Sequence, residues 1–195
     1  GTGNCHLFVD ATADPELALQ VLVNAKVQRP SVCNAVETLL VHSDIADTFV
    51  PKAVAAMSEH GVTVHGEERF RRVAGGGGVV PANAEDFADE WLSLDLSARV
   101  IDSLDEALTH VQEYSTGHSE TIITGDLTSQ RRWCAEVDAA AVLVNTSSRF
   151  VDGEQFGFGA EIGISTQKLH ARGPMGLAEM TSTKYVVTGS GQVRS

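Results

Sequence analysis

Cys33 has the most evident chemistry of any side chain in this sequence. It lies in the segment 28–37, which reads Gln-Arg-Pro-Ser-Val-Cys-Asn-Ala-Val-Glu. Pro30 ends a preceding helix, and Ser31 is a suitable N-cap. We therefore expect Cys33 in the first turn of a helix that continues to Glu37. The free N–H groups and positive dipole at such a helix start favour a nucleophilic thiolate. The alternative is a buried, unreactive thiol, since free cysteine often packs as a small hydrophobic residue.

The other two cysteines, Cys5 and Cys134, are weaker candidates for a nucleophile. Cys5 falls at the start of an expected strand and Cys134 within an expected helix, where nothing local lowers a thiol pKa. The cysteine spacing matches neither a disulfide framework nor a metal site. We therefore predict no metal, and the odd number of free thiols favours a reducing cytoplasm.

Strands and helices alternate along most of the chain, which is typical of a mostly parallel α/β sheet flanked by helices. Apolar runs predict strands at 6–9, 38–42, 62–65, 99–101, 121–124, 141–144 and 185–187. Capping residues and helical spacing predict helices at 14–27, 45–60, 104–111 and 127–137. Ligands bind at the carboxyl ends of strands in such sheets. Residues 145–149, directly after a strand, are therefore an expected ligand loop.

Two glycine-rich segments could approach a ligand closely. Residues 75–78 are four consecutive glycines, but they lack the lysine and the following helix of a P-loop. We expect them to form a surface loop. Residues 156–160 read Phe-Gly-Phe-Gly-Ala, which suits either a close backbone approach to a ligand or a tight connection packed by the two phenylalanines.

Composition excludes some classes of function. The 195 residues are 43% hydrophobic and 21% charged, as in an ordinary folded domain, and the formal net charge is −12. So acidic a chain offers no basic patch for nucleic acid. No apolar run reaches the roughly 20 residues that a membrane span needs. A small anionic substrate is still compatible, because it needs only a few donors.

Four segments together resemble gamma-glutamyl phosphate reductase, a family of the aldehyde dehydrogenase superfamily. They are the Cys33 segment and residues 107–120, 156–161 and 165–176, and they occur in the family's order. The similarity covers essentially the whole chain. It implies an aldehyde dehydrogenase-like catalytic domain over residues 1–180 and a C-terminal oligomerisation strand over residues 181–195. It also implies that the family's N-terminal cofactor-binding region is absent from this chain.

The resemblance implies NADPH-dependent reduction of L-glutamyl 5-phosphate to L-glutamate 5-semialdehyde, with release of phosphate, in proline biosynthesis. Cys33 would attack the acyl phosphate to give a thioester, which is then reduced. Hydrolytic members of the superfamily carry a Glu-Leu-Gly-Gly segment whose glutamate activates water. The corresponding residues here, 1–4, read Gly-Thr-Gly-Asn without a carboxylate, which favours phosphate-linked chemistry. NADPH or NADP+ would be bound mainly by the absent N-terminal half.

The resemblance further implies roles for residues around Cys33. Glu90 falls where the superfamily has a glutamate that holds the nicotinamide ribose, and an exposed acidic residue is the alternative. We assign Ser147, Arg149 and Phe150 to the glutamyl end of the substrate, because an arginine fork binds a carboxylate through two hydrogen bonds.

Lys168, His170 and Arg172 form the densest basic cluster and are candidates for phosphate binding, or alternatively for surface or subunit contacts. The resemblance implies a small-molecule substrate, a homo-oligomer and a possible coupling to glutamate kinase, which could form an upstream portion of the same chain. Two other functions stay open at this point. One is another aldehyde dehydrogenase that forms a free acid, and the other is a non-catalytic assembly domain.

Overall fold

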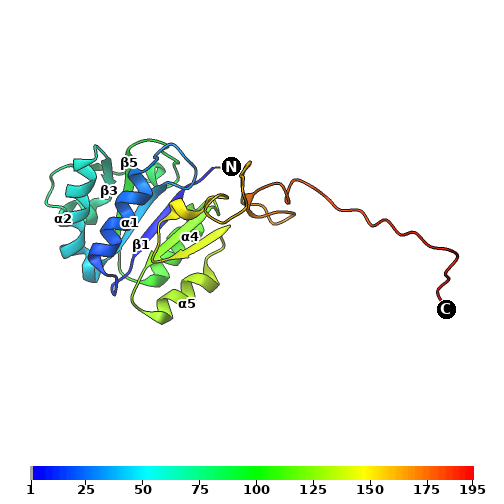
Figure 1. Ribbon diagram of the computed structural model, residues 1–195. Coiled ribbons are helices and arrows are strands. Elements are labelled where there is room, and N and C mark those ends of the chain that lie inside the picture. The colour runs from blue at the N-terminus through cyan, green and yellow to red at the C-terminus, as the bar shows by residue number, and fades with distance from the viewer. Residues whose placement is uncertain (1) are drawn as a thin grey trace.

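Seven parallel strands form the central sheet of the protein, in the order β4-β3-β5-β2-β1-β6-β7. Figure 1 shows this sheet with its flanking helices. The structure is a computed structural model and describes residues 2–195. The strands are β1 (Cys5–Val9), β2 (Val36–His42), β3 (Thr63–Gly66), β4 (Val79–Pro81), β5 (Asp95–Ile101), β6 (Ser119–Ile123) and β7 (Ala141–Val144). The predicted α/β class with a mostly parallel sheet is therefore confirmed.

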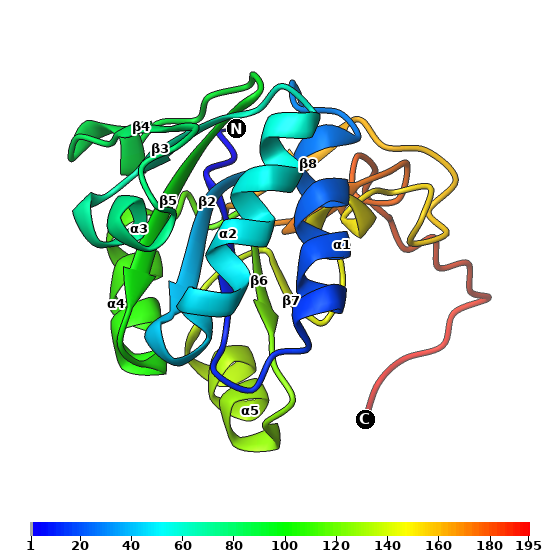
Figure 2. The same ribbon diagram turned by 90° about the vertical axis from the view of Figure 1, so that its left-hand side faces the viewer.

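Helices cover both faces of this sheet (Figure 2). They are α1 (Pro15–Val27), α2 (Ser43–Glu59), α3 (Glu68–Val73), α4 (Leu104–Tyr114) and α5 (Leu127–Glu136), with short 3-10 turns η1 (Glu85–Phe87) and η2 (Ser148–Phe150). The two faces have separate apolar cores. Leu7 and Val9 of β1 pack in the core that α1, α2 and α3 share, whereas Phe8 packs in the core under α4 and α5. All five residues of β1 are buried, as expected of a strand covered on both faces.

Local capping chemistry explains where the predicted helices begin. The Asp14 carboxylate accepts hydrogen bonds from the backbone N–H groups of Glu16 and Leu17, and Pro15 is the first residue of α1. Ser103 caps α4 in the same way, since its hydroxyl accepts a hydrogen bond from the Glu106 N–H at 3.1 Å. The predicted helices at 14–27 and 104–111 are confirmed, and α4 continues to Tyr114.

Some elements differ from the prediction. Residues 66–89, where no helix or strand was predicted, contain α3, β4 and η1, and β5 begins at Asp95, before the predicted start at residue 99. An antiparallel pair, β8 (Gly163–Ser165) and β9 (Gly173–Met175), was not predicted. Residues 185–187 form no strand, and residues 181–195 run away from the body as an exposed tail (Figure 1). A strand there needs a partner outside this chain, so the oligomerisation strand stays a prediction.

Neither a membrane span nor a metal cluster is found in the described part of the chain. None of the helices within residues 2–195 is both long and apolar enough to cross a membrane. Within the same range, no three His, Cys, Asp or Glu side chains are grouped so that they could hold a metal ion.

Candidate active site

The structure corrects the predicted helix at Cys33. Residues 30–35 form consecutive turns, and the chain then enters β2 at Val36. The central position of β2 explains the difference, because β2 pairs with β1 on one side and β5 on the other. Val36 already pairs with Cys5, so the ladder extends the strand almost to the nucleophile and leaves no room for a helix. Cys33 thus lies in a loop of residues 30–35 at the amino end of β2, called the nucleophile loop below after the predicted role of Cys33.

Without a helix dipole, the surroundings of Cys33 disfavour its thiolate. The side chain is partly buried, and burial raises the pKa of the Cys33 thiol. The nearby carboxylates of Glu161 and Glu90 raise this pKa further, while the backbone N–H of Cys33 lowers it. The pKa therefore shifts in the direction opposite to the prediction.

Three hydrogen bonds hold the chain at Cys33 and at the next residue, Asn34. The Asn34 side-chain amide donates to the Val151 carbonyl at 2.9 Å, and the Ser148 hydroxyl donates to the Asn34 carbonyl at 2.6 Å. The thiol of Cys5 donates to the Cys33 carbonyl at 3.2 Å. Asn34, Ser148 and Cys5 are all buried, so water competes little for these bonds. The nucleophile loop is thereby held from two distant parts of the chain.

Gly3 lies directly against the nucleophile loop. A Cβ atom added at Gly3 would stand 1.8 Å from the carbonyl oxygen of Cys33, so only glycine fits there. The Gly3 N–H donates to Glu90 Oε1 at 2.6 Å, which places Glu90 beside the same loop. The segment predicted to replace Glu-Leu-Gly-Gly therefore does contact the nucleophile loop through Gly3. Its first residue, Gly1, lies outside the described residues.

The candidate site lies at the amino ends of the strands, not at the carboxyl ends. Cys33 precedes β2, Gly3 precedes β1 and Glu90 precedes β5. Since these strands are parallel, their amino ends share one edge of the sheet. The expectation of a ligand site at the carboxyl ends was made for residues 145–149, whereas the loop that carries Cys33, the predicted nucleophile, lies at the opposite edge of the sheet.

The predicted ligand loop begins at the opposite edge and returns. Asn145 lies at the carboxyl end of the sheet, where its N–H donates to the Ile122 carbonyl and its side chain bonds both polar backbone groups of Thr124. The following residues run beside α1, and by Val151 the chain contacts Asn34 at the amino edge. This return is what brings η2 to the nucleophile loop.

The three residues predicted to bind the glutamyl group lie together in this returning loop. Ser147, Arg149 and Phe150 line an open pocket of about 400 Å³ between the loop and α1, of which Cys33 is not a lining residue. Arg149 Nε donates to Gln28 Oε1 at 2.6 Å, and the Arg149 N–H donates to the Ser147 hydroxyl at 3.2 Å. Burial lowers the pKa of Arg149, and the nearby Asp152 carboxylate opposes this shift.

The three phosphate candidates already have partners. Lys168 and Arg172 both pair with Asp138, which lies just before β7. His170 Nε2 lies 2.9 Å from the Glu179 carbonyl oxygen. The positive charges of Lys168 and Arg172 are thus partly neutralised within the chain. Their role in phosphate binding stays a prediction.

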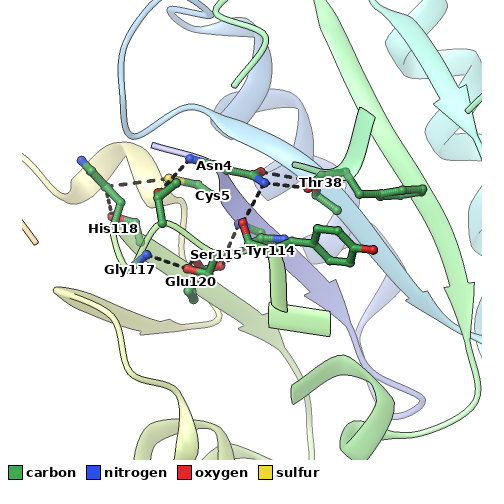
Figure 3. A network of polar contacts seen from close by, with 12 residues as sticks. Asn4, Cys5, Thr38, Tyr114, Ser115, Gly117, His118 and Glu120 are labelled. Carbon is green, nitrogen blue, oxygen red and sulfur yellow. Dashed lines mark hydrogen bonds and ion pairs between the residues drawn. The ribbon is translucent and has the colours of Figure 1, made fainter. Parts of the chain in front are cut away.

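A buried polar network supports the segment that follows Gly3 (Figure 3). Asn4 donates through its side-chain amide to the carbonyls of Phe87 and Tyr114, at 2.8 and 3.1 Å. Its backbone N–H donates to the Thr116 hydroxyl at 3.0 Å, and its side-chain oxygen lies 3.4 Å from the Thr38 hydroxyl. Sequence patterns did not reveal this role: the sequence offers only an asparagine ahead of an apolar run, and its complete burial is seen in the structure.

Sequence reasoning also missed a buried ion pair next to the nucleophile loop. Lys26 Nζ lies 2.6 Å from Glu37 Oε2, and both side chains are completely shielded from solvent. Burial raises the pKa of Glu37 to about 7 and lowers that of Lys26, in each case against the opposing effect of the partner. The second carboxylate oxygen, Glu37 Oε1, accepts a hydrogen bond from the Leu92 N–H at 3.3 Å.

Comparison with known proteins gives a consistent result. No family model matches the chain. The chain is 62% identical to gamma-glutamyl phosphate reductase of Thermobifida fusca and 61% identical to that of Cutibacterium acnes, each over 194 residues. These alignments cover 100% of this chain and 46% of each relative, so the chain spans about half the length of the curated relatives it matches.

Solved structures agree with these relatives. The crystal structure of gamma-glutamyl phosphate reductase from Thermotoga maritima matches with a TM-score of 0.93 and 52% identity, over 100% of this chain and 47% of that one. An acetylating aldehyde dehydrogenase from Geobacillus thermoglucosidasius matches with a TM-score of 0.68 and 18% identity, over 100% of this chain and 52% of that one, which supports the fold alone. The resemblance indicated by four sequence segments is thus confirmed: the whole chain is homologous to about half of a gamma-glutamyl phosphate reductase.

Proposed function

We propose that the full-length protein carrying this chain is an NADP-dependent gamma-glutamyl phosphate reductase that acts in proline biosynthesis in the cytoplasm. It would convert L-glutamyl 5-phosphate into L-glutamate 5-semialdehyde and release phosphate. The observation that carries this proposal is the clamped Cys33 loop, in a chain 62% identical to a reductase of that name. Most cofactor contacts are expected outside these residues, so the activity is proposed for the full-length protein and not for this chain alone.

Cys33 is the proposed nucleophile. Its thiolate attacks the carbonyl carbon of the acyl phosphate, the bond from that carbon to the phosphate oxygen breaks, and a Cys33 thioester and free phosphate result. The Cys5 thiol bonds the Cys33 carbonyl, and the Asn34 side chain bonds the Val151 carbonyl. By holding the loop, these bonds limit the orientations of the Cys33 thiol and so favour this step. Because burial and neighbouring carboxylates raise the thiol pKa, the rate of this step should increase with pH.

Glu90 is proposed to bind the nicotinamide ribose. A reduced nicotinamide supplies a hydride when it is bound. Glu90 Oε1 is engaged by the Gly3 N–H, whereas Oε2 has no hydrogen-bond partner among residues 2–195. A carboxylate oxygen with free lone pairs is the acceptor that a ribose hydroxyl requires. The chemistry of Glu90 and its place beside Cys33 therefore fit this role.

Arg149 is proposed to bind the carboxylate at the glutamyl end of the substrate, with Ser147 and Phe150 lining the same pocket. Gln28 engages Nε of the guanidinium, and the two terminal nitrogens have no hydrogen-bond partner among the described residues. Replacing Arg149 by Ala should raise the KM for glutamate 5-semialdehyde about 10- to 100-fold, the loss expected for charge-assisted hydrogen bonds. An unchanged KM would reject this assignment, and Arg149→Lys tests whether charge alone suffices.

The decisive experiment follows the reaction in reverse. NADP+ reduction by glutamate 5-semialdehyde is measured with and without phosphate, for the wild type, Cys33→Ala and the control Cys134→Ala, whose cysteine is exposed on α5. Turnover that needs both phosphate and Cys33 supports the proposal. Turnover without phosphate indicates a hydrolytic aldehyde dehydrogenase. No turnover in a folded protein favours a non-catalytic assembly domain.

We further propose that the protein is a homo-oligomer in which residues 181–195 pair with another copy. Tyr185, Val186 and Val187 are apolar and at least 78% exposed, so they gain from burial against a partner. Coupling to glutamate kinase and phosphate binding by Lys168, His170 and Arg172 are part of the same proposal.

A further inference from the structure

The segment 90–92 is held at each of its three residues. Glu90 accepts a hydrogen bond from the Gly3 N–H at 2.6 Å. The Trp91 ring stacks on His65, with ring centroids 4.3 Å apart, and its indole N–H donates to the Ser97 hydroxyl at 3.1 Å. These contacts come from three separate parts of the sheet edge, so the segment is far more constrained than a surface loop between η1 and β5 requires.

Leu92 adopts an unfavourable backbone conformation. Its φ angle is 53°, in the left-handed region that a leucine rarely enters and that is strained for a residue with a side chain. Its N–H donates to Glu37 Oε1 at 3.3 Å. The other carboxylate oxygen of Glu37 is paired with Lys26 at 2.6 Å, which fixes the orientation of the carboxylate. The buried pair thus presents one oxygen to the strained residue.

We propose that Glu37 is a positioning residue for Glu90. Oriented by Lys26, its carboxylate holds the Leu92 backbone in the left-handed conformation and thereby sets where Glu90 lies beside the Cys33 loop. Glu37 is completely buried and acts through Leu92, so it is not a catalytic residue. The expected effect of Glu37 on cofactor binding rests on the proposed function, because it assumes that Glu90 contacts the cofactor.

A buried ion pair that serves only packing is the alternative, and two double variants separate the two explanations. Lys26→Met/Glu37→Gln removes both buried charges and keeps an oxygen that can accept from the Leu92 N–H. Lys26→Met/Glu37→Leu removes the same charges and also removes that acceptor, at similar side-chain volume. Comparing the two double variants isolates the hydrogen bond to Leu92, because neither leaves an unpaired charge.

The measurements are made on the full-length enzyme. In the Leu variant we expect the KM for NADP+ to be about fivefold higher than in the Gln variant, the effect of one hydrogen bond. The KM for phosphate should agree between the two variants within about twofold. Amide hydrogen exchange at residues 90–92 should be faster in the Leu variant.

Equal KM values for NADP+ and equal hydrogen exchange in the two double variants would overturn the proposal. It would also be overturned if the Leu variant were impaired to the same degree in its KM for NADP+ and its KM for phosphate, relative to the Gln variant. Faster exchange at residues 90–92 without any phosphate-dependent turnover in the wild type would support the positioning role of Glu37. The same result would refute the proposed function, so the two failures are distinguishable.

Discussion

Gly3→Ala should misplace the nucleophile. The added Cβ would lie 1.8 Å from the Cys33 carbonyl oxygen and 2.6 Å from its carbonyl carbon, whereas real Cβ contacts stay above 3.0 Å. One of the two backbones must therefore move by more than about 1 Å. Neither can move freely, because Gly3 is bonded to Glu90 and the carbonyl of Cys33 is bonded to the Cys5 thiol. A displacement of about 1 Å at a reacting group can cost on the order of 100-fold in rate.

The assay is kcat for phosphate-dependent NADP+ reduction in the full-length enzyme, together with the rate of Cys33 alkylation. We expect kcat to fall about 100-fold and the alkylation rate to change, with a loss of about 1–3 kcal/mol in the free energy of unfolding. Gly77→Ala is the matched control, because a Cβ at Gly77 meets nothing within 4 Å and this glycine is not left-handed. The control should retain wild-type kcat and stability.

Wild-type kcat and alkylation in Gly3→Ala would refute the reasoning, because they would mean that the nucleophile loop tolerates the displacement. A large loss of stability with kcat intact would show that Gly3 matters for packing but not for the placement of Cys33.

Two further predictions concern buried ionisable side chains. Lys26→Met should lower the free energy of unfolding by about 3–5 kcal/mol, since it leaves the Glu37 carboxylate buried without its partner, and adding Glu37→Gln should restore most of the loss in urea unfolding. A single variant as stable as the double would contradict this. His110→Phe should make the free energy of unfolding less dependent on pH in acid. Burial lowers the pKa of His110 to about 3 in the folded state, whereas in the unfolded state this histidine binds a proton below its ordinary pKa of about 6.5. In the wild type, the stability that this histidine contributes above pH 6.5 is lost as pH falls, by about 3 kcal/mol at pH 4. A urea midpoint that depends equally on pH in the wild type and in His110→Phe would refute the assignment.

Elements set by local chemistry could be predicted from the sequence. Asp14 and Pro15 determine the start of α1 through contacts within a few residues, and Ser103 does the same for α4. The strand β7 was predicted with its observed bounds because a short apolar run fills it completely. In each case the information lies in consecutive residues.

The Cys33 loop could not be predicted in this way. Its local sequence favours a helix start, but pairing of β2 with both neighbours imposes an extended chain from Val36 onward. The contact of Gly3 with Cys33 and the bond of Asn34 to Val151 join residues far apart in sequence. Glu90 was found only through the family resemblance, because nothing in its local sequence indicates that it lies beside the nucleophile loop.

The bond between Asn34 and Val151 also has a consequence for the order of folding. The two residues are separated by 117 positions, so the nucleophile loop cannot close until nearly all of the sheet-forming chain has been synthesised. During synthesis, β2 can pair with β1 long before residue 151 leaves the ribosome, and Cys33 then lies in an open loop. The candidate site is therefore completed only after residue 151 has been synthesised, and we expect the reactivity of Cys33 to differ between the open loop and the completed domain.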